Sequence, residues 1–245
     1  MLKKFKAFTL AEILITLGII GIVAALTIPS LIENYQKKSV ANRLKKIYAV
    51  TKQAVLLSIA ENEEVSGWDW DLAEKDIYSF TKRYFAPYFK GAQLYKGTEF
   101  RKIAKNYSIK NLANKRIVIP DSNAYAIIIL IDGSYFITKE KHDTGYEWLY
   151  LDINGITGPN RIARDVFVLS MAPEYYFNKK LNSEIIFWNE GLSRKNLTEQ
   201  GPTEDIANSG YYGCSKKNKY GYYSGYNCGA LIKLDEWKIL SDYPW

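Results

Sequence analysis

Residues 8–32 read FTLAEILITLGIIGIVAALTIPSLI, and this stretch decides the fold. A short basic leader, MLKKFKA, precedes it at residues 1–7. The only charge in the stretch is Glu12, and residues 13–32 carry none. At about 1.5 Å per residue, a helix of that uncharged length spans roughly 30 Å, the thickness of a bilayer's hydrocarbon core. The sequence therefore predicts a membrane-spanning helix with one carboxylate at its entrance.

Three kinds of N-terminal segment share parts of this pattern. A secretory signal peptide has a shorter apolar core, about 7–15 residues long. An ordinary signal anchor explains the apolar length and the leader lysines but not Glu12, because a carboxylate at bilayer depth costs about 2.5–3.5 kcal/mol on insertion scales. If the segment spans the membrane, the leader lysines place the N-terminus in the cytoplasm. The chain after about Glu33 then lies outside the membrane.

The third interpretation is a resemblance to type IV pilins and type II secretion pseudopilins. It is carried by the leader lysines, by the run Phe8–Glu12 and by the apolar stretch that ends at Pro29. The resemblance implies that a prepilin peptidase cuts after Ala7 and methylates the new amine on Phe8. It also implies that Glu12 pairs with that amine on a neighbouring subunit during assembly.

Two positions depart from the usual pattern of that family. Ala7 stands where the family usually has Gly, and Ala11 stands where it usually has Ile or Val. A small residue before the cut still suits a cleavage pocket, so cleavage remains the expectation. Pro29 occupies a position where proline recurs in the family, and it should kink or locally melt the helix because it removes an intrahelical hydrogen bond.

The helical pattern continues beyond the membrane segment. Apolar residues at three- and four-residue spacing predict an amphipathic helix that runs from Phe8 to about Glu61. The resemblance implies that its second half lies on the sheet of a globular domain. The predicted docking stripe comprises Val40, Leu44, Ile47, Thr51, Ala54, Val55 and Ile59.

The period changes to that of strands after residue 123. Ala124–Ile131 and Ser134–Thr138 flank Asp132-Gly133, which is a strong hairpin signal. Further strands are predicted over 147–153 and 165–171, so the region should be an antiparallel meander. Elsewhere the sequence predicts a second helix over 68–90, loop with possible short elements over 91–115, a short helix within 182–197 and loop over 198–227.

These elements together predict an α+β fold with a long N-terminal helix and an antiparallel sheet. The resemblance to pilins implies that the helix docks on the sheet. The expected organisation has four parts: a cytoplasmic leader (1–7), a transmembrane helix (8–32), its amphipathic continuation (33–66) and a globular pilin-like domain with a C-terminal disulfide loop (67–245).

The two cysteines, Cys214 and Cys228, lie in the part expected to be exported, where two cysteines most simply form one disulfide. A zinc site would need further ligands, and the only histidine is His142. The formal charge is +7, of which three positive charges lie in the leader. The remaining excess, 7 − 3 = +4, does not by itself indicate nucleic-acid binding.

No catalytic constellation appears, so an enzyme is not expected and no cofactor is required. Asp152, Asn154 and Asp165 are weak candidates for a calcium site, since their oxygens suit that ion. Their spacing does not match the EF-hand loop, however, and Asp-x-Asn-Gly is typical of a hydrogen-bonded turn.

The leading functional prediction is a structural subunit of a type IV pilus or a type II secretion pseudopilus. Its expected partners are the peptidase, other subunits in a helical filament, an inner-membrane assembly platform and a cytoplasmic ATPase. The expected location is the bacterial inner membrane as a single-pass protein, with the globular domain periplasmic or extracellular, and then the filament.

The alternative is a minor pilin at the tip that binds a surface, a substrate or DNA, suggested by the basic stretch Lys96–Arg116 and a Gly/Tyr-rich loop before Cys228. A stand-alone tethered protein comes third.

Overall fold

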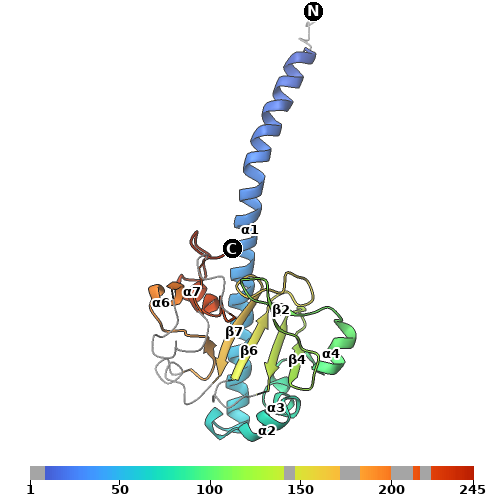
Figure 1. Ribbon diagram of the computed structural model, residues 1–245, viewed down its shortest axis with the longest axis vertical. Coiled ribbons are helices and arrows are strands. Elements are labelled where there is room, and N and C mark those ends of the chain that lie inside the picture. Colours follow the sequence, from blue (N-terminus) through green and yellow to red (C-terminus); the bar gives the residue numbers. More distant parts are fainter. Residues whose placement is uncertain (1–8, 141–146, 172–182, 200–211, 216–221) are drawn as a thin grey trace, which may run out of the picture. The chain divides into compact units, whose positions relative to one another are not determined.

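The computed structural model describes residues 9–140, 147–171, 183–199, 212–215 and 222–245. The chain forms two compact units, Met1–Ser39 and Val40–Trp245. One long helix, α1 (Leu10–Asn62), belongs to both units (Figure 1). Over the described residues it agrees with the helix predicted from Phe8 to about Glu61, and with the antiparallel sheet described below it confirms the predicted α+β, pilin-like class.

In the first unit, α1 stands without tertiary packing. None of the side chains from Leu10 to Ile32 is buried, although most of them are apolar. Pro29 lies inside the helix, and the residues on both sides of it remain helical. Thr27 and Ser30 donate their hydroxyls to backbone carbonyls within the same segment, at 2.9 Å in each case. These two hydroxyls are therefore satisfied within the helix, as polar groups in lipid must be.

In the second unit, one face of α1 packs into the core. The predicted stripe is confirmed: its central members are buried, and Val40 and Ile59 pack against the core while partly exposed. The buried residues of α1 are Ala41, Leu44, Ile47, Tyr48, Thr51, Ala54, Val55 and Ser58.

The core sheet has six strands in the order β1-β4-β5-β6-β7-β8, and every neighbouring pair is antiparallel. Its central strands β4 to β7 follow one another along the chain and confirm the predicted meander. Ile128 lies opposite Phe136, and Leu151 lies opposite Phe167, all fully buried or nearly so. The strands are β1 (Gln93–Lys96), β4 (Tyr125–Ile129), β5 (Tyr135–Lys139), β6 (Glu147–Asp152), β7 (Val166–Met171) and β8 (Ile186–Phe187).

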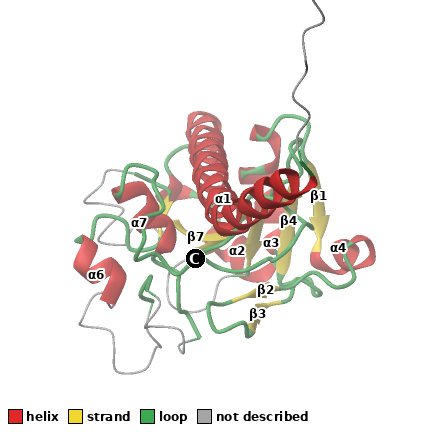
Figure 2. Cartoon of the chain, turned by 90° about the horizontal axis from the view of Figure 1, so that it is seen from above, coloured by secondary structure: helices red, strands yellow, loops and turns green. Residues whose placement is uncertain are grey.

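Short elements cover the rest of the sheet. The second half of α1 lies on one face, and a small two-stranded sheet, β2 (Ile109–Lys110) and β3 (Arg116–Val118), lies on the other (Figures 1 and 2). Helix α4 (Gly97–Ile103) flanks the β1 edge, and α6 (Arg194–Glu199) and α7 (Cys228–Leu234) lie at the β7–β8 side (Figure 2).

The predicted second helix over 68–90 is wrong as a single element. The structure divides it into α2 (Trp70–Lys75), α3 (Ile77–Tyr84) and a final 3-10 turn, η2 (Ala86–Tyr88), after an initial turn η1 (Val65–Gly67). The division has a local cause, because two aspartates cap separate helices. Asp69 accepts a hydrogen bond from the Leu72 N–H at 3.0 Å, and Asp76 accepts one from the Ser79 N–H at 3.1 Å.

The structure defines two more regions in detail. Residues 91–115, expected as loop with possible short elements, contain strand β1, helix α4 and strand β2. Strand β1 forms because it pairs with β4, although the segment has no strand period of its own. The short helix expected within 182–197 is strand β8 followed by the start of α6, and helix α7, which begins at Cys228, was not predicted.

Candidate functional site

The N-terminal end of α1 carries the acid that the sequence singles out. Both the backbone N–H and the hydroxyl of Thr9 donate to Oε2 of Glu12, each at 2.8 Å. The Glu12 N–H donates in return to Thr9 Oγ1 at 3.2 Å. This is a capping box, in which a Thr and a Glu three residues later satisfy each other's free N–H groups.

The capping box shows how the acid is held. Glu12 is fixed at the first turn of α1, where a negative charge is favoured by the helix dipole. Both hydrogen bonds from Thr9 reach Oε2, so the contacts of Glu12 with Thr9 leave its other oxygen, Oε1, available for a group outside the chain. The signature Thr-x-x-Glu was present in the sequence, yet the role of Thr9 was not predicted. Ala7 and Phe8, the predicted cleavage and methylation positions, lie outside the described residues.

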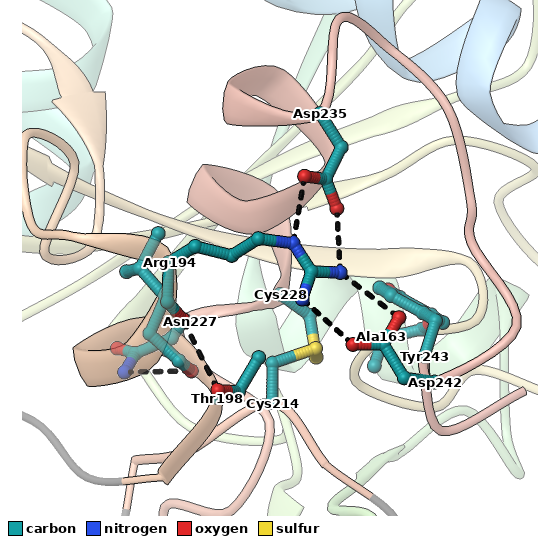
Figure 3. The surroundings of a disulfide bond; sticks show 10 residues. Ala163, Arg194, Thr198, Cys214, Asn227, Cys228, Asp235, Asp242 and Tyr243 are labelled. Carbon is teal, nitrogen blue, oxygen red and sulfur yellow. Dashed lines mark hydrogen bonds and ion pairs between the residues drawn. A yellow bond between two sulfur atoms is a disulfide. The ribbon is translucent and has the colours of Figure 1, made fainter.

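The disulfide joins Cys214 to the first residue of α7, Cys228, and both cysteines are fully buried (Figure 3). The Cys214 N–H donates to the Leu197 carbonyl at 2.8 Å, which ties the bridged segment to α6. Asn189 and Asn227 are also buried here and hydrogen-bond to each other at 2.9 Å. The bridge therefore joins Cys214, which is hydrogen-bonded to α6, to the start of α7.

Arg194 holds the C-terminal tail over this bridge. Its guanidinium lies between two carboxylates, with Nε 2.9 Å from Asp235 Oδ1 and Nη1 2.8 Å from Asp242 Oδ2 (Figure 3). These carboxylates raise the pKa of the Arg194 guanidinium. Beyond them, the buried Tyr243 hydroxyl donates to the Ala163 carbonyl at 2.7 Å. The last residues of the chain are thus part of the folded unit.

A polar cluster connects α1 with this C-terminal region. The Tyr48 hydroxyl donates to Glu190 at 3.1 Å, and Lys233 of α7 forms an ion pair with Glu190 and donates to the Tyr48 oxygen at 3.1 Å. Burial and the neighbouring Glu190 raise the pKa of Tyr48. No local sequence pattern joins these residues, because Tyr48 is 142 residues from Glu190 and 185 residues from Lys233.

The weak calcium candidates lie at the β6–β7 connection. Asp152 Oδ1 accepts the N–H groups of Asn154 and Gly155, at 3.1 and 2.8 Å, which is the hydrogen-bonded turn that the sequence favoured. Asp165 accepts two other backbone N–H groups, at 2.8 and 2.7 Å. Burial raises the pKa of both carboxyls, and the charge of Asp165 raises that of Asp152 further. Among the described residues, no group of three His, Cys, Asp or Glu side chains is placed to hold a metal ion.

Most of the described tyrosines of the Gly/Tyr-rich loop pack against other side chains and are not fully exposed to solvent. Tyr226 is buried and lies 3.2 Å from the Tyr150 hydroxyl, and Tyr212 stacks on Tyr223. Tyr222 is half exposed and donates its hydroxyl to the Ile117 carbonyl at 2.9 Å. These contacts favour a structural role for this part of the loop. Residues 200–211 and 216–221 of the loop, and His142, lie outside the described residues.

An apolar groove of about 700 Å³ extends beside α1 within the second unit. One wall comes from the exposed flank of α1, and the other from η2 and the β4–β5 turn. The polar groups at its rim largely satisfy one another: Lys46 lies 3.3 Å from Asp132, and Tyr88 donates to Glu61 at 2.9 Å. The groove's apolar lining comprises Ile47, Val50, Ala54, Leu57, Pro87, Phe89, Leu130 and Ile131.

The comparisons with known families agree with this anatomy. Residues 2–28 match the prokaryotic N-terminal methylation motif, which is the prepilin signal of type IV pilins and pseudopilins. The motif and the exposed apolar helix define a pilin-like, membrane-anchored protein of a structural class.

Residues 30–245 match the model of a family of unknown function (DUF6613), and the chain belongs to that family. Neither the curated proteins nor the solved structures contain a match to the chain.

Proposed function

We propose that this protein is a minor subunit of a type IV pilus or of a type II secretion pseudopilus. A prepilin peptidase cuts it after Ala7 and methylates Phe8, and the mature chain enters a helical filament through α1. The observation that carries the proposal is the contrast within α1, whose first half has no buried side chain while its second half forms part of a folded core.

The apolar first half dictates how assembly proceeds. Before assembly, residues 13–32 are solvated by lipid with the N-terminus in the cytoplasm, and the globular unit lies on the other side of the inner membrane. On assembly, the same side chains exchange lipid for helices of neighbouring subunits. An inner-membrane platform and a cytoplasmic ATPase supply the work of extraction.

Glu12 guides this exchange. A carboxylate in lipid is costly, and pairing with the methylated amine of a neighbouring subunit offsets that cost. The capping box supports the assignment, because Thr9 holds one oxygen of Glu12 and orients the carboxylate at the end of the helix. No cofactor is needed for such a role, and calcium is not required.

Replacing Glu12 with Ala tests the proposal in cells that assemble the filament. We expect the variant to insert in the membrane normally and to be lost from sheared or sedimented filaments. Glu33→Ala is the matched control, because it removes a carboxylate from the same helix beyond the apolar run. Equal incorporation of Glu12→Ala and the wild-type chain would contradict the proposal. Mass spectrometry of the mature N-terminus should show one methyl group on Phe8.

A second candidate function is contact with DNA through the basic stretch Lys96–Arg116. Its support is the exposure of four cations there: Lys102, Lys105, Lys115 and Arg116. Binding through these side chains would weaken steeply with salt, since it depends on release of counterions from phosphates. A filter-binding titration at several salt concentrations tests it, and affinity that does not change with salt would exclude it.

A further inference from the structure

We propose that the groove beside α1 receives residues 21–32 of a second copy of this chain, with the two helices parallel and offset by about 25 residues, or roughly 38 Å at 1.5 Å per residue. The inference rests on the proposed filament function and names the partner surface that the function leaves open.

The groove needs an occupant because its apolar lining is open to water. Val50, Leu57 and Ile131 are 41%, 48% and 77% exposed, respectively, and they lie together in one hollow. Contiguous apolar surface of this kind is uncommon on a soluble domain and typically marks an interaction site.

The form of the groove suits a helix. It follows α1 from Lys46 to Glu61, a distance of about 22 Å at 1.5 Å per residue. A hollow lined along one helix over this length is the space that a second helix fills when side chains of one pack between side chains of the other.

The charges of the groove suit an uncharged occupant. Its lining contains two cations, Lys46 and Lys90, and two acids, Glu61 and Asp132, so they cancel. Lys46 and Asp132 already pair with each other. A lining without net charge offers nothing to a nucleic acid or another strongly charged partner, because such partners need an excess of the opposite charge.

The chain itself supplies an uncharged helix of the right kind. Residues 13–32 carry no charge, and none of their side chains is buried in the structure. Gly21, Ala24 and Ala25 present little side-chain bulk, which permits close approach of another helix. Every copy has the same basic leader and enters the membrane in the same orientation, so the helices of two copies are parallel.

Charged residues at the far end of the groove, and at the end of the occupant's apolar segment, set how the two helices align. At the far end of the groove, Glu61, Glu63 and Glu64 are exposed, and in the occupant Lys37 and Lys38 follow the apolar segment. Placing Lys38 beside Glu63 of the other copy gives the offset of 25 residues. The same offset puts Ala25 opposite Val50 and Ile32 opposite Leu57, so apolar residues meet the apolar lining.

Cysteine crosslinking tests this register in the full-length chain. The two natural cysteines are bonded to each other, so any new crosslink between copies comes from the introduced pair. We expect Ala25→Cys combined with Val50→Cys to give crosslinked multimers in filaments. The matched control is Ala25→Cys with Leu56→Cys, because Leu56 is exposed on α1 but lies outside the groove lining. Equal crosslinking in both pairs would overturn the inference.

A charge exchange tests the end contact separately. Lys38→Glu or Glu63→Lys alone should lower the crosslinking yield by about two- to five-fold, the range of an exposed ion pair. The two changes together should restore it. A combined loss larger than either single loss would overturn the proposed register.

The outcomes separate the inference from the function beneath it. Filaments that form and depend on Glu12, yet give no Ala25–Val50 crosslink, would overturn the groove contact alone. Filament assembly that is indifferent to Glu12→Ala would overturn the proposed function. If native mass spectrometry found a lipid bound to the purified chain, and Leu57→Trp expelled it without changing filament assembly, the groove would be a lipid site and the inference would fail.

Discussion

The two halves of α1 belong to one helix but differ in whether their side chains are buried by the rest of the chain. From Leu10 to Ile32 no side chain is buried, whereas eight residues between Ala41 and Ser58 are buried in the core. The first half is apolar on all faces, so lipid or other subunits must cover its side chains. The second half is apolar on one face, and other residues of the same chain cover that face. Identical substitutions in the two halves should therefore affect different properties, folding in one and assembly in the other.

The largest expected effect comes from one substitution made in both halves. Leu44→Ala removes a fully buried side chain and should lower the free energy of unfolding by about 2–5 kcal/mol. Leu17→Ala makes the same chemical change at a residue that is 60% exposed, so unfolding of the globular unit should not change. Thermal unfolding of both variants in detergent measures the difference. Similar losses in the two variants would break the comparison.

The next effect concerns the disulfide, which acts only on the second half's domain. Replacing Cys214 and Cys228 with Ser should destabilise the folded unit by about 3 kcal/mol, because the unfolded chain regains the freedom of an open loop. Membrane insertion of the first half should be unaffected. Chemical unfolding with and without reductant gives the measurement, and a wild-type chain that is insensitive to reductant even when unfolded would argue against the bridge.

A smaller effect is expected from the buried acids of the β6–β7 connection. Burial and Asp165 raise the pKa of Asp152, so the folded chain binds protons more tightly than the unfolded chain. Stability from this group is therefore fully present below the unfolded pKa, about 4, and is lost as the pH rises through the higher folded pKa.

Asp152→Asn keeps an oxygen for the turn's N–H groups and removes the charge. It should flatten the pH dependence and raise the free energy of unfolding at neutral pH by no more than about 1 kcal/mol, the scale of one hydrogen bond. Asp71→Asn, at an exposed acid of α2, is the control and should leave the pH profile unchanged. The same unfolding assay with added calcium should show no stabilisation. If calcium raised the free energy of unfolding and Asp152→Asn abolished that increase, Asp152 would belong to a calcium site.

The smallest effect is expected at the start of α1. Thr9→Ala removes the cap that holds Glu12, so amide exchange should become faster over the first turn while global unfolding stays constant. Incorporation into filaments should fall less than in Glu12→Ala, because the carboxylate itself remains. Thr9→Ser retains the hydroxyl and should behave like the wild-type chain. Identical exchange in the Ala and Ser variants would rule out this role for Thr9.

Features that depend on neighbouring residues could be predicted from the sequence. The first half of α1 follows from a long uncharged run, the docking stripe from helical spacing, and the β4–β5 hairpin from Asp132-Gly133. The capping box was equally local and could have been found from Thr9 and Glu12. The separation of α2 from α3 was also readable, since Asp69 and Asp76 each precede a helix by one residue.

Features that depend on distant partners could not be predicted. Strand β1 has four residues without alternation, and it is a strand because β4 pairs with it. The cluster of Tyr48, Glu190 and Lys233 exists only once α1, β8 and α7 have been brought together. The apolar groove is likewise built from three separate regions of sequence, so single exposed residues such as Ile131 gave no signal of it.

The cluster around Tyr48 has a mechanical consequence. In the filament proposed above, a subunit would receive its load through α1, and the globular unit would have to stay attached to that helix. Lys233 and Glu190 fasten Tyr48 to α7, which the Cys214–Cys228 bridge anchors in turn. A pull on α1 would therefore reach α7 and its disulfide as well as strand β8, because Tyr48 also stacks on Phe187.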